Sequence, residues 1–148
     1  MGKEYLKGLF RKFISAEDEA YAMYKNFAEI SKSPVLKELF LTLAEEESGH
    51  KRLFEEMEPA KVVNKNAGKI EKIKFAGIDK KLMTGDELKE FVKSLDLAIM
   101  LEQKSHEEYK KLAAFMNESE EKLAVLEVAK QELKHKEKLI LVKEELLK

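Results

Sequence analysis

Glu47-Ser48-Gly49-His50 recurs later in the chain as Glu132-Leu133-Lys134-His135. Residues three apart lie on one face of an α-helix, so each stretch aims a carboxylate and an imidazole at one point. Glu17 and Glu102 precede the glutamates of the two motifs by the same interval. The pattern places six candidate ligands in two matching sets and decides the fold that we expect around them.

The sequence around these motifs repeats in the same register. When the chain is aligned with itself so that Glu47 meets Glu132, 11 of the 38 positions from Ile14 to Lys51 are identical without a gap. About three identities would be expected by chance from so biased a composition. We therefore interpret the chain as a duplicated helical hairpin with approximate two-fold symmetry, in two copies rather than a solenoid.

Four segments carry apolar residues at alternating steps of three and four, which is typical of helices packed in a bundle. The predicted helices span residues 3–31, 34–57, 85–116 and 118–147. Capping signals support three of the helix starts. These signals are Ser33 followed by Pro34, Thr84 with Glu87, and Asn117 with Glu120.

The connections between the helices indicate the fold class. Short loops make each consecutive pair an antiparallel hairpin, 3–57 and 85–147, whereas the long segment 58–84 has to cross the bundle. An all-α, four-helix bundle with one long crossover is the ferritin-like arrangement. We expect one domain over 1–148, with the crossover covering one bundle end as a short helix or extended piece.

Composition excludes several classes of function. The 28 basic and 29 acidic residues leave a net charge of −1, which argues against binding nucleic acid. The absence of cysteine excludes disulfides, thiolate nucleophiles, iron–sulfur clusters and cysteine-based zinc sites. Since the sequence has neither a membrane-length apolar run nor a signal-peptide pattern, we expect no membrane association and a cytoplasmic location.

Six polar residues interrupt the apolar stripes at positions that should face the core. They are Glu17, Glu47, His50, Glu102, Glu132 and His135. Buried carboxylates repel one another unless they are protonated or held by a cation. Two divalent ions would neutralise four carboxylates, as would two trivalent ions with one bridging oxide. Carboxylates with imidazole suit iron or manganese, and zinc also fits. The alternative is a salt-bridged bundle whose glutamates face water.

The same residues carry a family resemblance. The first helix (Glu17 to Ala28) and the second (Ala44 to Leu53) resemble those of rubrerythrin-type members of the ferritin-like di-iron carboxylate family. The resemblance covers nearly the whole chain except the crossover. It implies two iron ions bridged by Glu47 and Glu132, one completed by Glu17 and His50, the other by Glu102 and His135. It also implies that Tyr24 and Tyr109 orient carboxylates, although both also fit an ordinary amphipathic core.

Two departures from the family pattern bear on function. Rubrerythrins with this bundle can add a C-terminal rubredoxin domain with four cysteines, whereas this sequence has none. We therefore expect electrons from an external donor, such as a rubredoxin-type protein or a small reductant. Those rubrerythrins also carry a further glutamate that takes part in a metal shift during peroxide reduction, and here that position is Ser105.

Three functions remain open at this stage. The first is a di-iron oxidoreductase of the peroxidase or ferroxidase type, acting on hydrogen peroxide or oxygen. The second is a non-enzymatic metal-binding protein that buffers iron or holds structural zinc or manganese. The third is a metal-free helical interaction module. The resemblance also implies a homodimer, and the long crossover allows exchange of hairpins between chains.

Two further features have competing interpretations. His106 lies one turn after Glu102, where it is either an outer or alternative ligand or a surface and packing residue. The seven lysines of segment 58–84 form either a docking patch for an acidic electron carrier or ordinary solvated loop charge.

Overall fold

A computed structural model describes residues 3–57 and 85–148 of the chain. Its four helices are α1 (Lys3–Ile30), α2 (Pro34–Glu56), α3 (Gly85–Phe115) and α4 (Glu120–Leu146). These bounds agree with the predicted helices to within two residues at every end, and the all-α fold class is confirmed. None of the helices in this part of the chain is long and apolar enough to cross a lipid bilayer.

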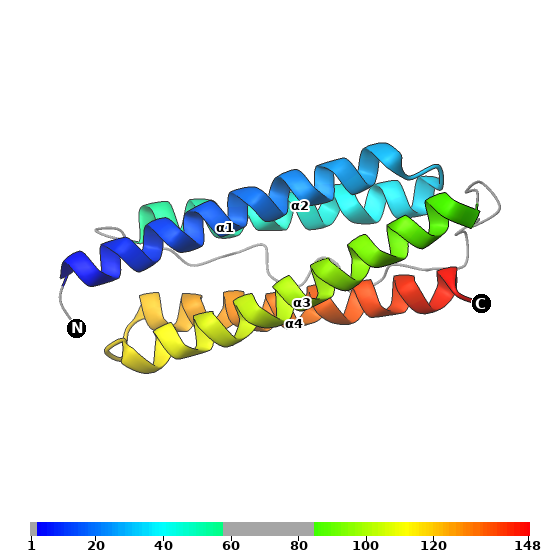
Figure 1. The fold of residues 1–148 in the computed structure, drawn as a ribbon. Coiled ribbons are helices and arrows are strands. Elements are labelled where there is room, and N and C mark those ends of the chain that lie inside the picture. The colour runs from blue at the N-terminus through cyan, green and yellow to red at the C-terminus, as the bar shows by residue number, and fades with distance from the viewer. Residues whose placement is uncertain (1–2, 58–84) are drawn as a thin grey trace.

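The helices form two antiparallel hairpins that pack as two layers, α1 with α2 and α3 with α4 (Figure 1). In Figure 1, α2 ends at one end of the bundle and α3 begins at the other, so these two helices point the same way. This arrangement confirms the ferritin-like four-helix bundle. The predicted crossover 58–84, its lysines and the cap at Thr84 lie outside the described residues.

Serine caps begin two of the helices. Ser33 has an extended backbone, its hydroxyl accepts from the Leu36 N–H at 3.4 Å, and Pro34 follows at the first helical position, as predicted. The predicted cap at Asn117 is wrong, because Ser119 caps α4 and accepts from the Lys122 N–H at 3.1 Å. A start at Ser119 places two glutamates in the first turn, where they interact favourably with the helix dipole.

The apolar core is divided into two clusters by a polar layer halfway along the bundle. One cluster contains residues from the second half of α1 and α4 and the first half of α2 and α3, with Phe40 and Leu43 fully buried. The other combines the opposite halves, with Val125 and Val128 fully buried. On every helix, the candidate ligands lie between the residues of these two clusters. The fold therefore surrounds the polar layer with dry packing.

Aromatic side chains join the two hairpins on both sides of this layer. Phe91 of α3 contacts Phe27 and Phe40 with ring centroids 5.6 and 5.8 Å apart. On the other side, Tyr109 of α3 contacts Phe13 of α1 at 4.8 Å. Close backbone contacts lie mainly within each hairpin, so side chains carry most of the contact between hairpins.

Removing the Phe40 ring tests this description of the core. Phe40 is 0% exposed and packs on rings from two other helices, so Phe40→Ala should lower the free energy of unfolding by about 3–5 kcal/mol. Leu41→Ala is the matched control, because Leu41 is 40% exposed and should cost far less. Chemical denaturation measures both, and equal losses would contradict the assigned core.

Candidate metal centre

The polar layer consists of the six residues singled out in the sequence, and all of them are buried. The four glutamates are only 1–2% exposed and the two histidines 0–1%. Each helix contributes to the layer because its apolar stripe carries a polar residue near mid-length. The alternative in which these glutamates face water is therefore wrong.

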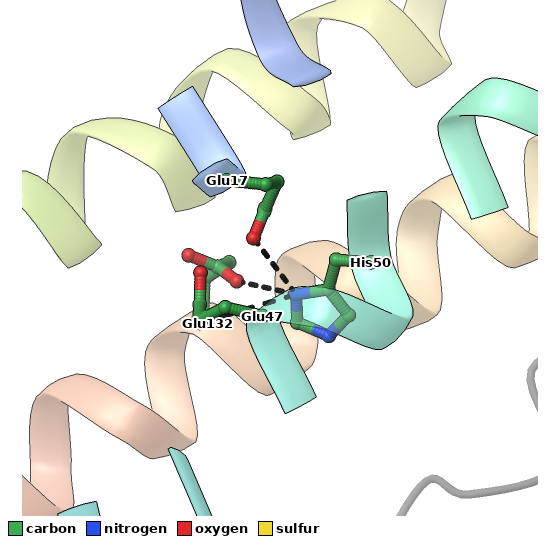
Figure 2. A group of neighbouring side chains, drawn as sticks. All are labelled: Glu17, Glu47, His50 and Glu132. Carbon is green, nitrogen blue, oxygen red and sulfur yellow. Dashed lines mark ion pairs between the residues drawn. The ribbon is translucent and has the colours of Figure 1, made fainter. Parts of the chain in front are cut away.

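The first group of ligand atoms surrounds the His50 ring. Glu17, Glu47, His50 and Glu132 each offer one atom, and these atoms all lie within 4.8 Å of one another. Figure 2 shows the three carboxylates turned toward the Nδ1 atom of His50. That nitrogen lies 2.8 Å from Glu132, 3.5 Å from Glu17 and 4.0 Å from Glu47.

The second group is the repeat-related counterpart of the first. Glu47, Glu102, Glu132 and His135 again place one atom each within 4.8 Å of the others. The His135 Nδ1 atom lies 2.7 Å from Glu47 and 3.6 Å from Glu102. Glu47 and Glu132 belong to both groups, whereas the other four residues belong to one each. The structure thus brings together all six predicted residues, with the two motif glutamates in the shared positions.

The unpaired atoms in this layer test whether a metal fits. Each of the six residues has one buried nitrogen or oxygen without a hydrogen-bond partner. The Nδ1 atom of His50 and the Oε1 atom of Glu132 are close, but their geometry is not that of a hydrogen bond. Unpaired buried polar atoms are costly, and converging oxygen and imidazole donors satisfy the preferences of iron, manganese or zinc. The residues present therefore fit a metal ion in each group.

The outer nitrogens of both histidines have partners that the sequence analysis missed. The Nε2–H of His50 donates to Gln131 Oε1 at 2.6 Å, and that of His135 donates to Glu46 Oε2 at 2.9 Å. Such bonds orient an imidazole and would leave its Nδ1 atom available to a metal ion. A sequence signal was present, because Glu46 and Gln131 directly precede the motif glutamates and are paired with each other when the two halves are aligned.

Two buried tyrosines hold carboxylates across the interface between the hairpins. Tyr24 of α1 donates to Glu102 of α3 at 2.5 Å, and Tyr109 of α3 donates to Glu17 of α1 at 2.6 Å. Burial and the nearby carboxylates raise the pKa of both phenols well above the ordinary value of 10.0. Both hydroxyls therefore remain protonated donors at neutral pH.

The buried charges perturb one another strongly in the metal-free protein. Burial, followed by the neighbouring carboxylates, raises the pKa of Glu47 and Glu132 well above 4.5. Burial also acts to raise the pKa of Glu17 and Glu102. The histidine charge and the hydrogen bonds that each receives outweigh it, so their pKa values are lowered.

The net pKa shift of each histidine is opposite to the shift that burial alone would cause. Burial acts to lower the pKa of His50, but the Glu17 carboxylate outweighs it and the net shift is upward. The same balance, with Glu102 as the main carboxylate, raises the pKa of His135 well above 6.5. Without metal, protons therefore occupy the place of the missing positive charge.

His106 lies outside both groups of ligand atoms. Its Nδ1–H donates to the backbone carbonyl of Ala129 at 2.6 Å, which ties α3 to α4. The side chain is half-buried. This geometry favours the packing interpretation of His106 over a role as a metal ligand.

The sequence was compared with protein-family models, curated proteins and solved structures, and one family model matched. Residues 9–142 match the family model described as Rubrerythrin. This range contains all six candidate ligands and both tyrosines. The comparisons found no match among curated proteins and none among solved structures.

The pKa shifts predict how the metal-free protein responds to pH. A raised pKa in the folded state gives stability below the unfolded value that is lost as the pH rises through the folded value. The histidine contribution should therefore be present below pH 6.5 and disappear above it. The raised pKa values of Glu47 and Glu132 likewise give stability below pH 4.5 that is lost above it. The lowered pKa values of Glu17 and Glu102 act in the opposite direction, so their contribution is lost as the pH falls below 4.5.

The expected result is a maximum in the melting temperature of chelator-treated protein near pH 4.5, with a decline that begins there and steepens above pH 6.5. Divalent metal should remove the decline on the alkaline side, because the cation replaces the protons. Thermal unfolding followed by circular dichroism measures both curves. A metal-free melting temperature that rises steadily above pH 6.5 would contradict the assigned charge balance.

Proposed function

The chain belongs to the rubrerythrin family, and on that basis we propose that it is a di-iron carboxylate oxidoreductase acting on hydrogen peroxide or oxygen. The observation that carries the proposal is the set of six buried, unpaired ligand atoms in two groups that share Glu47 and Glu132. We further propose that the electrons come from an external donor, such as a rubredoxin-type protein. The four cysteines of a rubredoxin site have no counterpart among these 148 residues.

The two shared carboxylates would lie between the iron ions. Glu17 and His50 would complete one position, and Glu102 and His135 the other. The four carboxylates carry a charge of −4, which two divalent cations balance. Neutrality matters here because apolar clusters lie on both sides of the layer. An uncompensated charge in such an environment is strongly destabilising.

The two iron ions would supply one electron each, which with two protons reduces hydrogen peroxide to two water molecules. The surrounding residues would hold the ligands rather than react. The Tyr24 and Tyr109 hydroxyls keep the terminal carboxylates Glu102 and Glu17 in place. The apolar clusters exclude bulk water, which strengthens the electrostatic interactions within the layer.

A non-enzymatic metal-binding protein is the second candidate. It is favoured by the position of the layer, because each group takes ligands from both hairpins. A redox-silent ion such as zinc, or a manganese ion, would there clamp the hairpins together. The ligands would be the same as in the oxidoreductase, so the two functions differ in the metal and in turnover.

Removing the shared carboxylates tests the site. Glu47→Ala/Glu132→Ala should abolish binding of both metal ions, because each glutamate serves both groups. Glu45→Ala/Glu137→Ala is the matched control, since it removes two exposed glutamates from the same helices and should leave binding intact. The measurements are metal content after anaerobic iron loading and the rate of peroxide consumption with a supplied reductant. Retention of two metals per chain and full turnover by the first variant would refute the assignment.

The metal in protein purified without added metal separates the candidate functions. Two iron ions per chain, with rapid oxidation by peroxide and continued turnover, support the oxidoreductase. Full occupancy by zinc without turnover favours the binding protein instead. If the purified protein contains no stoichiometric metal and is nevertheless stably folded, the metal-free interaction module is the remaining candidate.

Position 105 offers a second test of the chemistry. Ser105 is half-buried on α3, one turn beyond Glu102, at the place where other rubrerythrins carry a glutamate for the metal shift. Ser105→Glu should therefore raise peroxide turnover by about a hundredfold while leaving two metals bound, on the scale of one positioned catalytic interaction. Ser105→Gln, which adds the same bulk without charge, is the control. A faster rate in both variants, or in neither, would show that the added carboxylate does not act as proposed.

A further inference from the structure

Glu46 and Gln131 break the symmetry of an otherwise matched site. The two residues hold equivalent places in the two halves of the chain, each directly before a motif glutamate. They act crosswise, since Glu46 of α2 binds His135 of α4, and Gln131 of α4 binds His50 of α2. One histidine therefore has a carboxylate behind it, and the other has a neutral amide.

The carboxylate behind His135 has two effects on the ring. An ionised carboxylate can only accept hydrogen bonds, so it fixes the proton on Nε2 and leaves Nδ1 as the ligand atom. Its negative charge also makes the imidazole a more basic ligand. The Glu46 side chain is 13% exposed, so water screens this charge only in part.

The amide behind His50 fixes the ring less firmly. Gln131 accepts through Oε1, but its Nε2 atom is buried without a hydrogen-bond partner. Rotating the amide by half a turn would present a donor to the His50 Nε2 atom and shift the ring proton to Nδ1. A protonated Nδ1 cannot bind a metal. The ligand form of His50 is therefore permitted by its partner but not enforced.

The tyrosine partners of the two groups are closely matched. The tyrosine bonds to Glu102 and Glu17 are nearly equal in length, at 2.5 and 2.6 Å. Asp18 and Gln103 also hold equivalent places and differ in charge, and they bind the repeat-related Lys51 and Lys136. Asp18 is 60% exposed and already paired with Lys51, so its influence on the buried layer is weak.

We propose that the two metal positions are unequal, and that the position of Glu102 and His135 fills first because Glu46 orients and activates its histidine. This inference rests on the proposed two-metal site. Loss of such an outer partner changes metal affinity by about ten- to a hundredfold. The wild-type protein should therefore bind two metals in two steps separated by a factor of that size.

Calorimetric titration of the metal-free full-length protein with cobalt(II) alone measures these steps without enzyme activity. Glu102→Gln should remove the tight step, because Glu102 belongs only to the His135 group. Glu17→Gln should remove the weak step and leave the tight one. The reverse assignment, or two equal steps in the wild-type protein, would overturn the inference while leaving the proposed two-metal site standing. Binding of no cobalt would refute both.

Replacing Glu46 alone isolates the contribution of its carboxylate. Glu46→Gln should weaken the tight step by about tenfold or more and bring the two steps together. Glu45→Gln is the matched control, because it removes the same charge from an exposed neighbouring position and should change neither step. If both single variants bind cobalt alike, Glu46 does not have this role.

The double exchange Glu46→Gln/Gln131→Glu provides a readout that a loss of stability cannot imitate. It moves the carboxylate from His135 to His50, so the position of Glu17 and His50 should now fill first. Adding Glu17→Gln or Glu102→Gln to the exchange identifies which position is tight. A general weakening of the fold would lower both affinities without reversing their order, and an unreversed order overturns the inference.

Discussion

Four carboxylates buried in one layer halfway along the bundle are the constraint on which the rest of the structure depends. Their mutual repulsion in a dry interior has to be offset by cations or by protons. The surrounding residues are consistent with a site built for cations, because each of the six residues points an unpaired atom into the layer. The upward pKa shifts of both histidines show the same demand for positive charge in the metal-free protein.

The duplicated sequence explains how two hairpins form one site. Each hairpin supplies a single glutamate and a Glu-x-x-His motif, and its tyrosine and its outer residue reach across to the other hairpin. Contacts between the hairpins are made mainly by side chains, and the polar layer is part of their interface because each group takes residues from both hairpins. Metal binding in this layer would therefore be coupled to the association of the hairpins, as is general where a site is assembled only by folding.

Much of this arrangement could be predicted from the sequence, because polar residues on an apolar stripe reveal both a helix and its buried face. The stripe positions of Glu17 and Glu102 indicated their burial, and the constant offset between the two halves indicated the two groups. Periodicity does not show which helix a side chain faces, so the crossed bonds of Tyr24 and Tyr109 required the structure. The start of α4 was misplaced because Asn117 and Ser119 are both good caps, and only the backbone distinguishes them.

The central claim is that six residues of this layer hold two metal ions that share Glu47 and Glu132. A crystal structure of the iron-loaded protein, with anomalous scattering recorded at the iron edge, tests it most directly. We expect two anomalous peaks inside the layer, one beside Glu17 and His50 and one beside Glu102 and His135, with the shared glutamates contacting both. A single peak, or peaks outside the layer, would contradict the account.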